Sequence, residues 1–203
     1  MKLKVCLVGD EGVGKTSLVR RYVLSEFDER YLRTVGVVVT KRIAYVEVDG
    51  GTYGTTLTVW DILGRRDFVG RFDGPYLANA AGVLAACDLT RPETEASFEE
   101  YWAPRVRGVA GSIPMIVVGN KVDLVEARED SLRAVGELGK KHGTPAFVSS
   151  AKTGENVEAA FLAIGTLVVA QPEAAEGEGV GTKEEGPLTL VGPEIKVGDK
   201  APD

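Results

Sequence analysis

The sequence has few of the features that mark secreted, membrane-spanning or nucleic-acid-binding proteins. It contains only two cysteines, and each lies inside an apolar run, which indicates buried thiols in a reducing compartment rather than a disulfide framework. The formal net charge is −6, whereas a nucleic-acid surface needs clustered Lys and Arg side chains. The apolar run before Gly9 is too short for a signal peptide or a membrane span. We therefore expect a cytoplasmic protein without a nucleic-acid partner.

Hydrophobic runs and helical patterns alternate along most of the chain. Four near-continuous apolar runs are typical of strands that are buried on both faces of a parallel sheet, and they span residues 2–8, 82–87, 113–118 and 145–149. Helical patterns span residues 15–24, 93–107, 125–142 and 155–169. This alternation predicts an α/β fold with helices on both faces of the sheet.

Two further β-rich runs, residues 37–48 and 52–60, are joined by Asp49, Gly50 and Gly51. Such a turn composition lets two strands fold back against each other as an antiparallel pair. We therefore expect a six-stranded, mostly parallel sheet with one antiparallel edge strand and five helices.

The composition changes after the last helical pattern. Residues 172–203 hold eight acidic and three basic side chains, with Gly and Pro throughout. A segment this polar buries too little apolar surface to offset its ordering entropy, so we expect a mostly flexible tail. The expected division is a domain of residues 1–170 followed by an acidic, Gly- and Pro-rich tail of residues 171–203.

Residues 9–16, Gly-Asp-Glu-Gly-Val-Gly-Lys-Thr, match the phosphate-loop motif G-x-x-x-x-G-K-[ST] between a predicted strand and a predicted helix. The glycines let the backbone curl so that its N–H groups point toward a bound phosphate. The N-terminus of the following helix adds partial positive charge. We expect Lys15 to reach the β- and γ-phosphates and the Thr16 hydroxyl to ligate Mg²⁺. A tight turn without a ligand is the alternative. The predicted phosphate-binding residues are Glu11, Gly12, Val13, Gly14, Lys15, Thr16 and Ser17.

The sequence Asn120-Lys121-Val122-Asp123 follows the predicted strand 113–118. The Asp123 carboxylate can accept hydrogen bonds from both the N1–H and the N2–H₂ groups of guanine, a donor pair that adenine lacks. Asn120 would tie this segment to the phosphate loop, and the stem of Lys121 would lie over the base. Taken alone, this short motif is also compatible with a solvated turn.

A second segment supports guanine recognition. Ser149, Ser150, Ala151 and Lys152 follow the predicted strand 145–149. The backbone N–H of Ala151 is suited to donate to guanine O6. We therefore predict a guanine-nucleotide site that also includes Ser150, Ala151 and Lys152.

The ordered set of these motifs resembles the Ras superfamily of small GTPases, and residues 9–17 are most similar to the Rab branch. The resemblance covers residues 2 to about 170. It implies the G-domain fold of P-loop NTPases and a molecular switch that binds GTP or GDP with Mg²⁺ and hydrolyses GTP slowly. It also implies effector or regulator proteins that read the switch segments, residues 30–40 and 61–77. A small-molecule kinase is a further alternative, but it does not explain the Asn120–Asp123 motif.

Two more segments, residues 31–36 and 60–64, are similar to the family's first and second switches. The resemblance implies that Thr34 ligates Mg²⁺ through its hydroxyl and meets the γ-phosphate through its backbone. Asp61 would hold the metal through water, and the Gly64 N–H would touch the γ-phosphate. An ordinary strand residue stays an alternative for Thr34.

The resemblance also assigns two aromatic residues to the nucleotide. Phe27 would pack against the guanine edge, and Tyr31 would line the site as part of the first switch. A plain core aromatic stays an alternative for Phe27.

Two residues depart from the family pattern where the γ-phosphate would lie. Arg65 stands where most relatives carry Gln, and Glu11 stands where they carry a small residue. Because a guanidinium only donates, Arg65 cannot accept a hydrogen bond from the attacking water. Either Arg65 or Arg66 serves as an arginine finger supplied in cis, or hydrolysis is very slow and the protein is a GTP-binding interaction module. Pairing of Arg65 with Glu11 would neutralise the added charge.

From this reasoning the predicted catalytic residues are Arg65, Gly64 and Thr34, and the predicted metal ligands are Thr16, Thr34 and Asp61.

Residues 187–203 resemble the opening segment of thiol-peroxidase and peroxiredoxin domains. No cysteine follows Cys87, so we expect neither peroxidase activity nor the prenylated cysteines that anchor many Ras and Rab proteins to membranes. The sequence leaves the oligomeric state open.

Overall fold

The computed structural model describes residues 1–28, 36–64 and 74–171 of the chain. Six strands form one sheet in the order β2-β3-β1-β4-β5-β6. They are β1 Lys2–Val8, β2 Val37–Val48, β3 Gly51–Ile62, β4 Gly82–Asp88, β5 Met115–Asn120 and β6 Ala146–Val148. Every pair is parallel except β2 with β3, which confirms the predicted sheet with one antiparallel edge strand.

The β2–β3 hairpin closes through two residues, because Val48 pairs directly with Gly51. The two loop residues, Asp49 and Gly50, both have positive φ values, of 50° and 77°. A two-residue turn of this kind matches the twist of the flanking strands and favours Asp-Gly. The local sequence therefore sets the register of the edge strand.

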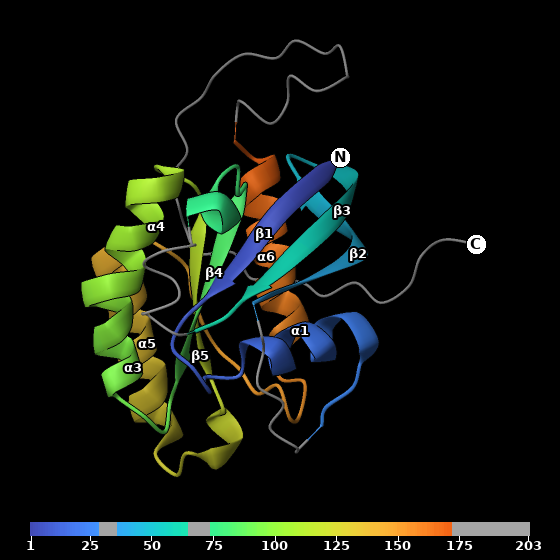
Figure 1. Ribbon diagram of the computed structural model, residues 1–203. Helices are drawn as coiled ribbons and strands as arrows, with labels where there is room; N and C mark the ends of the chain where they lie inside the picture. The colour runs from blue at the N-terminus through green and yellow to red at the C-terminus, as the bar shows by residue number, and fades with distance from the viewer. Residues whose placement is uncertain (29–35, 65–73, 172–203) are drawn as a thin grey trace.

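The helices are α1 Lys15–Leu24, α3 Glu93–Ser97, η1 Phe98–Trp102, α4 Ala103–Ala110, η2 Val122–Leu124, α5 Arg128–His142 and α6 Val157–Val169. Residues 74–77 are also helical. Helices α1 and α6 cover one face of the sheet, and α3, α4 and α5 cover the other (Figure 1), as the sequence predicted. Among the described residues, no helix combines the length and the apolar character that a bilayer crossing requires.

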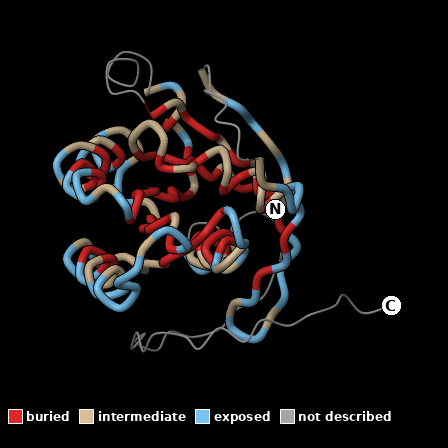
Figure 2. The backbone as a smooth tube through the Cα atoms, turned by 90° about the horizontal axis from the view of Figure 1, so that it is seen from below, coloured by how far each residue is buried: buried red, intermediate tan, exposed pale blue. Residues whose placement is uncertain are grey.

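Each face of the sheet has its own hydrophobic core, and β1 contributes to both. Val5 and Leu7 belong to the core under α1 and α6, whereas Cys6 and Val8 belong to the opposite core. Successive strand residues point to opposite faces, so a strand with two covered faces must be apolar throughout. Buried positions accordingly run through the interior in Figure 2 and exposed ones lie on the outer sides of the helices.

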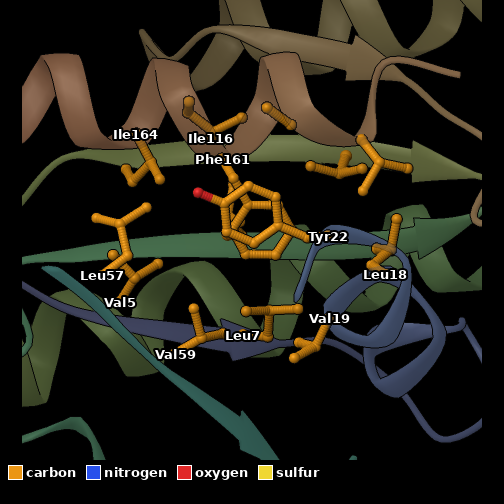
Figure 3. Packing of buried hydrophobic residues seen from close by; sticks show 14 of the residues in the cluster. Val5, Leu7, Leu18, Val19, Tyr22, Leu57, Val59, Ile116, Phe161 and Ile164 are labelled. Atoms are coloured by element: carbon orange, nitrogen blue, oxygen red, sulfur yellow. The ribbon is translucent and has the colours of Figure 1, made fainter. Parts of the chain in front are cut away.

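An aromatic pair joins α1 to α6 in the first of these cores. The rings of Tyr22 and Phe161 are parallel within 2° and their centroids lie 4.1 Å apart (Figure 3). Aliphatic side chains of the sheet, among them Leu57, surround the two rings. Such a stack adds to the free energy of area burial, and it holds α1, whose first two residues end the phosphate-loop motif.

The helical segment of residues 93–110 differs from the uniform helix that the sequence predicted. Its middle part, η1, is a π-helical turn in which the Ala103 N–H donates to the carbonyl of Phe98, five residues earlier. Pro104 explains the change, because proline has no N–H to donate and its ring clashes with the carbonyl four residues before it.

Both cysteines are free and buried, as predicted. Burial raises the pKa of the Cys6 thiol to about 12, and it also raises the pKa of Cys87. Neither thiol is therefore ionised near neutral pH.

Two glycines of α5 give opposite expectations for substitution by alanine. A Cβ at Gly139 would lie 2.7 Å from the Thr144 carbonyl oxygen and 2.8 Å from the Ala146 Cβ, whereas a Cβ at Gly136 would meet nothing within 4 Å. We expect Gly139→Ala to lower the free energy of unfolding by about 1–3 kcal/mol through overpacking. Gly136→Ala, the matched control, should raise it by about 0.5–1 kcal/mol through helix propensity. Urea denaturation measures both, and equal effects would contradict the packing of α5 on β6.

Candidate functional site

A pocket of about 380 Å³ lies where the predicted phosphate loop meets the segments after β5 and β6. Most of the predicted site residues line it: Glu11, Gly12, Gly14, Lys15, Thr16, Ser17, Phe27, Gly64, Asn120, Lys121, Asp123, Ala151 and Lys152. Val13 and Ser150 are fully buried behind the wall of the pocket. Thr34, Tyr31 and Arg65 lie outside the described residues. The sequence did not point to Arg20, Asp28, Ile62, Leu63 and Leu124, which also line the pocket.

Two glycines of the phosphate loop allow close approaches that a side chain would prevent. A Cβ at Gly9 would lie 2.2 Å from the Ala86 carbonyl oxygen, and a Cβ at Gly14 would lie 2.3 Å from the Asn120 amide nitrogen. Both residues also have positive φ values, of 135° and 98°. The loop therefore needs glycine at these positions for packing as well as for conformation.

Lys15 is the first residue of α1 and is only 6% exposed. Its ammonium donates to the carbonyls of Gly9 at 2.7 Å and Asp10 at 2.9 Å. Burial lowers the pKa of Lys15 to about 8, although nearby carboxylates such as Asp61 act in the opposite direction. A buried ammonium at the N-terminal end of a helix is an environment that favours an anionic ligand.

Beside Lys15, the Thr16 hydroxyl donates to the Asp61 carboxylate at 2.5 Å. Asp61 is 1% exposed and lies near the end of β3. A hydroxyl and a carboxylate are hard oxygen ligands of the type that Mg²⁺ prefers. In the described part of the chain, no three His, Cys, Asp or Glu side chains gather to hold a metal by themselves. The residues present therefore fit an ion that takes most of its ligands from phosphate and water.

Asn120, at the end of β5, connects the two halves of the pocket. Its amide nitrogen donates to the Val13 carbonyl at 2.9 Å, so the predicted link to the phosphate loop is present. Its amide oxygen accepts from the backbone N–H of Ala151 at 3.0 Å. The Ala151 N–H, for which the sequence predicts donation to guanine O6, here makes this bond and holds the loop after β6 in place.

Asp123 is exposed to the pocket, and a buried hydroxyl orients it. The Ser150 hydroxyl donates to Asp123 Oδ1 at 2.5 Å and accepts from the Thr153 N–H at 3.1 Å. Ser150 itself has no exposed surface. The carboxylate is thereby held in the lining of the pocket that also contains Lys15.

Sequence reasoning missed Asp88, which is 1% exposed at the end of β4. Its carboxylate accepts from Lys121 Nζ at 2.6 Å and from Arg91 Nε at 2.9 Å. Burial alone would raise the pKa of Asp88, but the hydrogen bonds from Lys121, Thr90 and Arg91 outweigh it and lower that pKa. The available signal was an acidic residue ending a buried strand, followed three residues later by arginine.

Arg21, on α1, was also missed. Its Nε donates to the Ala151 carbonyl at 2.8 Å, and its Nη2 donates to the Lys152 carbonyl. These bonds hold the loop after β6 against α1. An arginine in the last turn of a helix gives no such indication from sequence alone.

Comparisons with known proteins agree with the pattern of the site. Residues 4–170 match the Ras family model. The GTP-binding protein ypt4 of Schizosaccharomyces pombe is 32% identical over 180 residues, which cover 86% of this chain and 74% of that protein. The Ras-related protein Rab-27B of Rattus norvegicus is 30% identical over 178 residues, 84% of this chain and 81% of that protein.

The Ras-related protein RIC1 of Oryza sativa subsp. japonica is 34% identical over 159 residues, which cover 78% of this chain and 76% of that protein. The family match ends at residue 170 and gives no support to the peroxiredoxin resemblance of residues 187–203, which lie outside the described residues. Over the G-domain portion, sequence motifs, sheet topology and relatives agree, and the chain belongs to the Ras family.

Proposed function

We propose that the protein is a small GTP-binding molecular switch that binds GTP or GDP together with Mg²⁺ and hydrolyses GTP slowly. The observation that carries this proposal is the single pocket shared by Lys15 and Asp123, with Asn120 bonded to the loops on both sides. A cation suited to phosphate and a carboxylate suited to guanine are thus held on one rigid frame.

Asp123 is the group that selects guanine in this proposal. Its carboxylate accepts from the N1–H and N2–H₂ of the base, and Ser150 fixes its orientation from behind. Adenine would leave these acceptors without donors. A site made to hydrogen-bond one base discriminates strongly against an analogue that lacks the matching donors. Lys121, whose ammonium is held by Asp88, also lines the pocket, and its stem would lie over the base.

The phosphate loop supplies the other half of the site. Lys15 and the N-terminal end of α1 bind the phosphate oxygens, and Gly64 lies close enough that a Cβ there would be 2.5 Å from Lys15 Nζ. Thr16 and Asp61, with Thr34 from outside the described residues, are the groups that would hold Mg²⁺. When bound, the ion neutralises charge on the phosphate oxygens.

Slow hydrolysis follows from the residue types at the γ-phosphate end. Arg65 donates only, so it does not orient water as Gln does in most relatives. Glu11 lines the pocket, and its carboxylate would add negative charge beside a triphosphate. A GTP-binding interaction module that does not hydrolyse is the second candidate, and these two residues are the reason for it.

The proposed partners are effector or regulator proteins that read residues 30–40 and 61–77. Val38 and Val39, inside the first of these segments, are 46% and 45% exposed at the start of edge strand β2. Exposed apolar side chains at a sheet edge suit contact with another protein.

Guanine selection is tested by Asp123→Asn. Because asparagine offers one acceptor where the carboxylate offers two, we expect GDP affinity to fall by about 10²–10⁴. Asp130→Asn, on the exposed surface of α5, is the matched control and should bind GDP as the wild type does. Calorimetry with GDP and ADP measures the effect, and equal affinity of the wild type for both nucleotides would contradict the proposal.

The metal assignment is tested by Thr16→Ala. Chelation of Mg²⁺ should accelerate GDP release from the wild type, whereas the variant should release GDP quickly with or without chelator, since it lacks a metal ligand. Thr52→Ala, at an exposed position of β3, should keep the wild-type response. Release is followed with a fluorescent GDP analogue. If chelation strongly accelerated GDP release from Thr16→Ala, the assignment of Thr16 as a metal ligand would be wrong.

The hydrolysis assignment is tested by Arg65→Gln and Arg65→Ala in single-turnover assays. We expect Arg65→Gln to hydrolyse GTP faster than the wild type, because an amide oxygen accepts a hydrogen bond from the attacking water. Arg65→Ala should stay near the slow wild-type rate. Arg133→Gln, on the exposed face of α5, controls for the loss of one positive charge. A loss of 10³-fold or more in both Arg65 variants would instead assign an arginine finger in cis.

A further inference from the structure

The phosphate loop is held from outside by residues that none of its motifs contain. A loop that points its N–H groups into a pocket must turn its carbonyls outward, where each needs a donor. Lys15 and Asn120 satisfy three of them, those of Gly9, Asp10 and Val13. Further bonds to the loop come from the segment of residues 88–102.

Arg91 bonds the middle of the loop. Its Nη2 donates to the Glu11 carbonyl at 3.0 Å, and its Nε donates to the buried Asp88 at 2.9 Å. The guanidinium also lies over Gly12, where a Cβ would be 3.6 Å from Nη2. Because Asp88 also binds Arg91, the planar guanidinium is already oriented for its hydrogen bond to the loop.

Ser97 and Trp102 bond the start of the loop. The Ser97 hydroxyl and the Trp102 indole N–H donate to the same oxygen of Asp10, Oδ1, at 2.7 Å and 2.8 Å. Both donors are almost completely buried, at 2% and 1% exposure. Two buried donors on one carboxylate oxygen make a strong and directional contact.

The π-helical turn η1 makes this convergence possible. In a regular α-helix, residues five apart point in directions that differ by roughly 140°. The wider turn, marked by the bond from Ala103 to the Phe98 carbonyl, reduces the difference in direction between residues five apart. Ser97 and Trp102 can therefore reach one atom of Asp10.

We infer that Arg91, Ser97 and Trp102 are positioning residues that hold the phosphate loop in its anion-binding shape through the Glu11 carbonyl and the Asp10 carboxylate. This outer brace, defined as these three donors and their two acceptors, deepens the proposed function and rests on it. Its effect falls on the phosphate half of the site. It should therefore strengthen the binding of nucleotides with a β-phosphate and leave the recognition of the base unchanged.

The experiment compares GDP and GMP binding in variants of the full chain. Asp10→Ala removes the acceptor of Ser97 and Trp102, and Arg91→Lys keeps the charge but cannot bridge Asp88 to the loop. For each variant we expect GDP affinity to fall about tenfold and GMP affinity to change less than twofold. Asp10→Asn should restore GDP binding, because its amide oxygen still accepts both donors.

Matched controls separate positioning from general stability. Glu99→Gln alters η1 at a side chain that pairs with Lys141 and His142, and Arg107→Lys alters an arginine of α4 that bonds the His142 carbonyl. Both should bind GDP as the wild type does. Trp102→Phe and Ser97→Ala should each reproduce part of the Asp10→Ala effect. If Trp102→Phe does not fold, Asp10→Ala and Arg91→Lys decide the result.

Hydrogen exchange of the nucleotide-free protein gives a second readout. The amides of residues 10–14 should exchange faster in Asp10→Ala and Arg91→Lys than in the wild type. Wild-type GDP affinity in both variants, or equal losses for GDP and GMP, would overturn the outer brace. If the wild type itself bound no GDP, the proposed function would fail, and the exchange of residues 10–14 would still decide whether the brace orders the loop.

Discussion

The arrangement of the pocket depends on one side-chain amide, that of Asn120. Its nitrogen donates to the phosphate loop and its oxygen accepts from the loop after β6, so both ends of a buried amide are satisfied by backbone groups. Because β4 lies between β1 and β5, the amide reaches across one strand to do this. Removing it would leave a buried N–H and a buried carbonyl without these partners. One side chain therefore links the phosphate loop directly to the loop after β6.

Asn120 and the loops that it bonds lie at the carboxyl ends of the parallel strands. β1, β4, β5 and β6 are parallel, so the segments that follow them emerge side by side at their carboxyl ends. Glycines permit the close packing that this edge requires, for example Gly119 next to the end of β5, where a Cβ would lie 2.7 Å from a side-chain carbon of Val135 on α5. Close helix-to-sheet packing leaves the loops little freedom, which is why short motifs suffice to build the site.

Much of this could be predicted because the responsible signals are local. Strands covered on both faces must be apolar, Asp49-Gly50 specifies a tight hairpin, and the phosphate loop has its own spacing of glycines. Boundaries were less accurate where a proline intervenes. β5 begins at Met115 rather than residue 113, since Pro114 has no N–H for the ladder, and Pro104 produces the π-helical turn within the segment expected to be a regular helix.

Three of the residues that sequence reasoning missed, Arg21, Asp88 and Arg91, do not line the pocket and instead bond to backbone or side-chain groups around it. Arg21 and Arg91 donate to backbone carbonyls. Because every residue type has a backbone carbonyl, the sequence of a loop does not indicate which side chains donate to it. A loop that turns its N–H groups inward nevertheless always creates outward carbonyls that need donors. The need for an outer layer of donors is thus predictable from the motif. Which side chains fill it depends on tertiary neighbours, and only the fold identifies them.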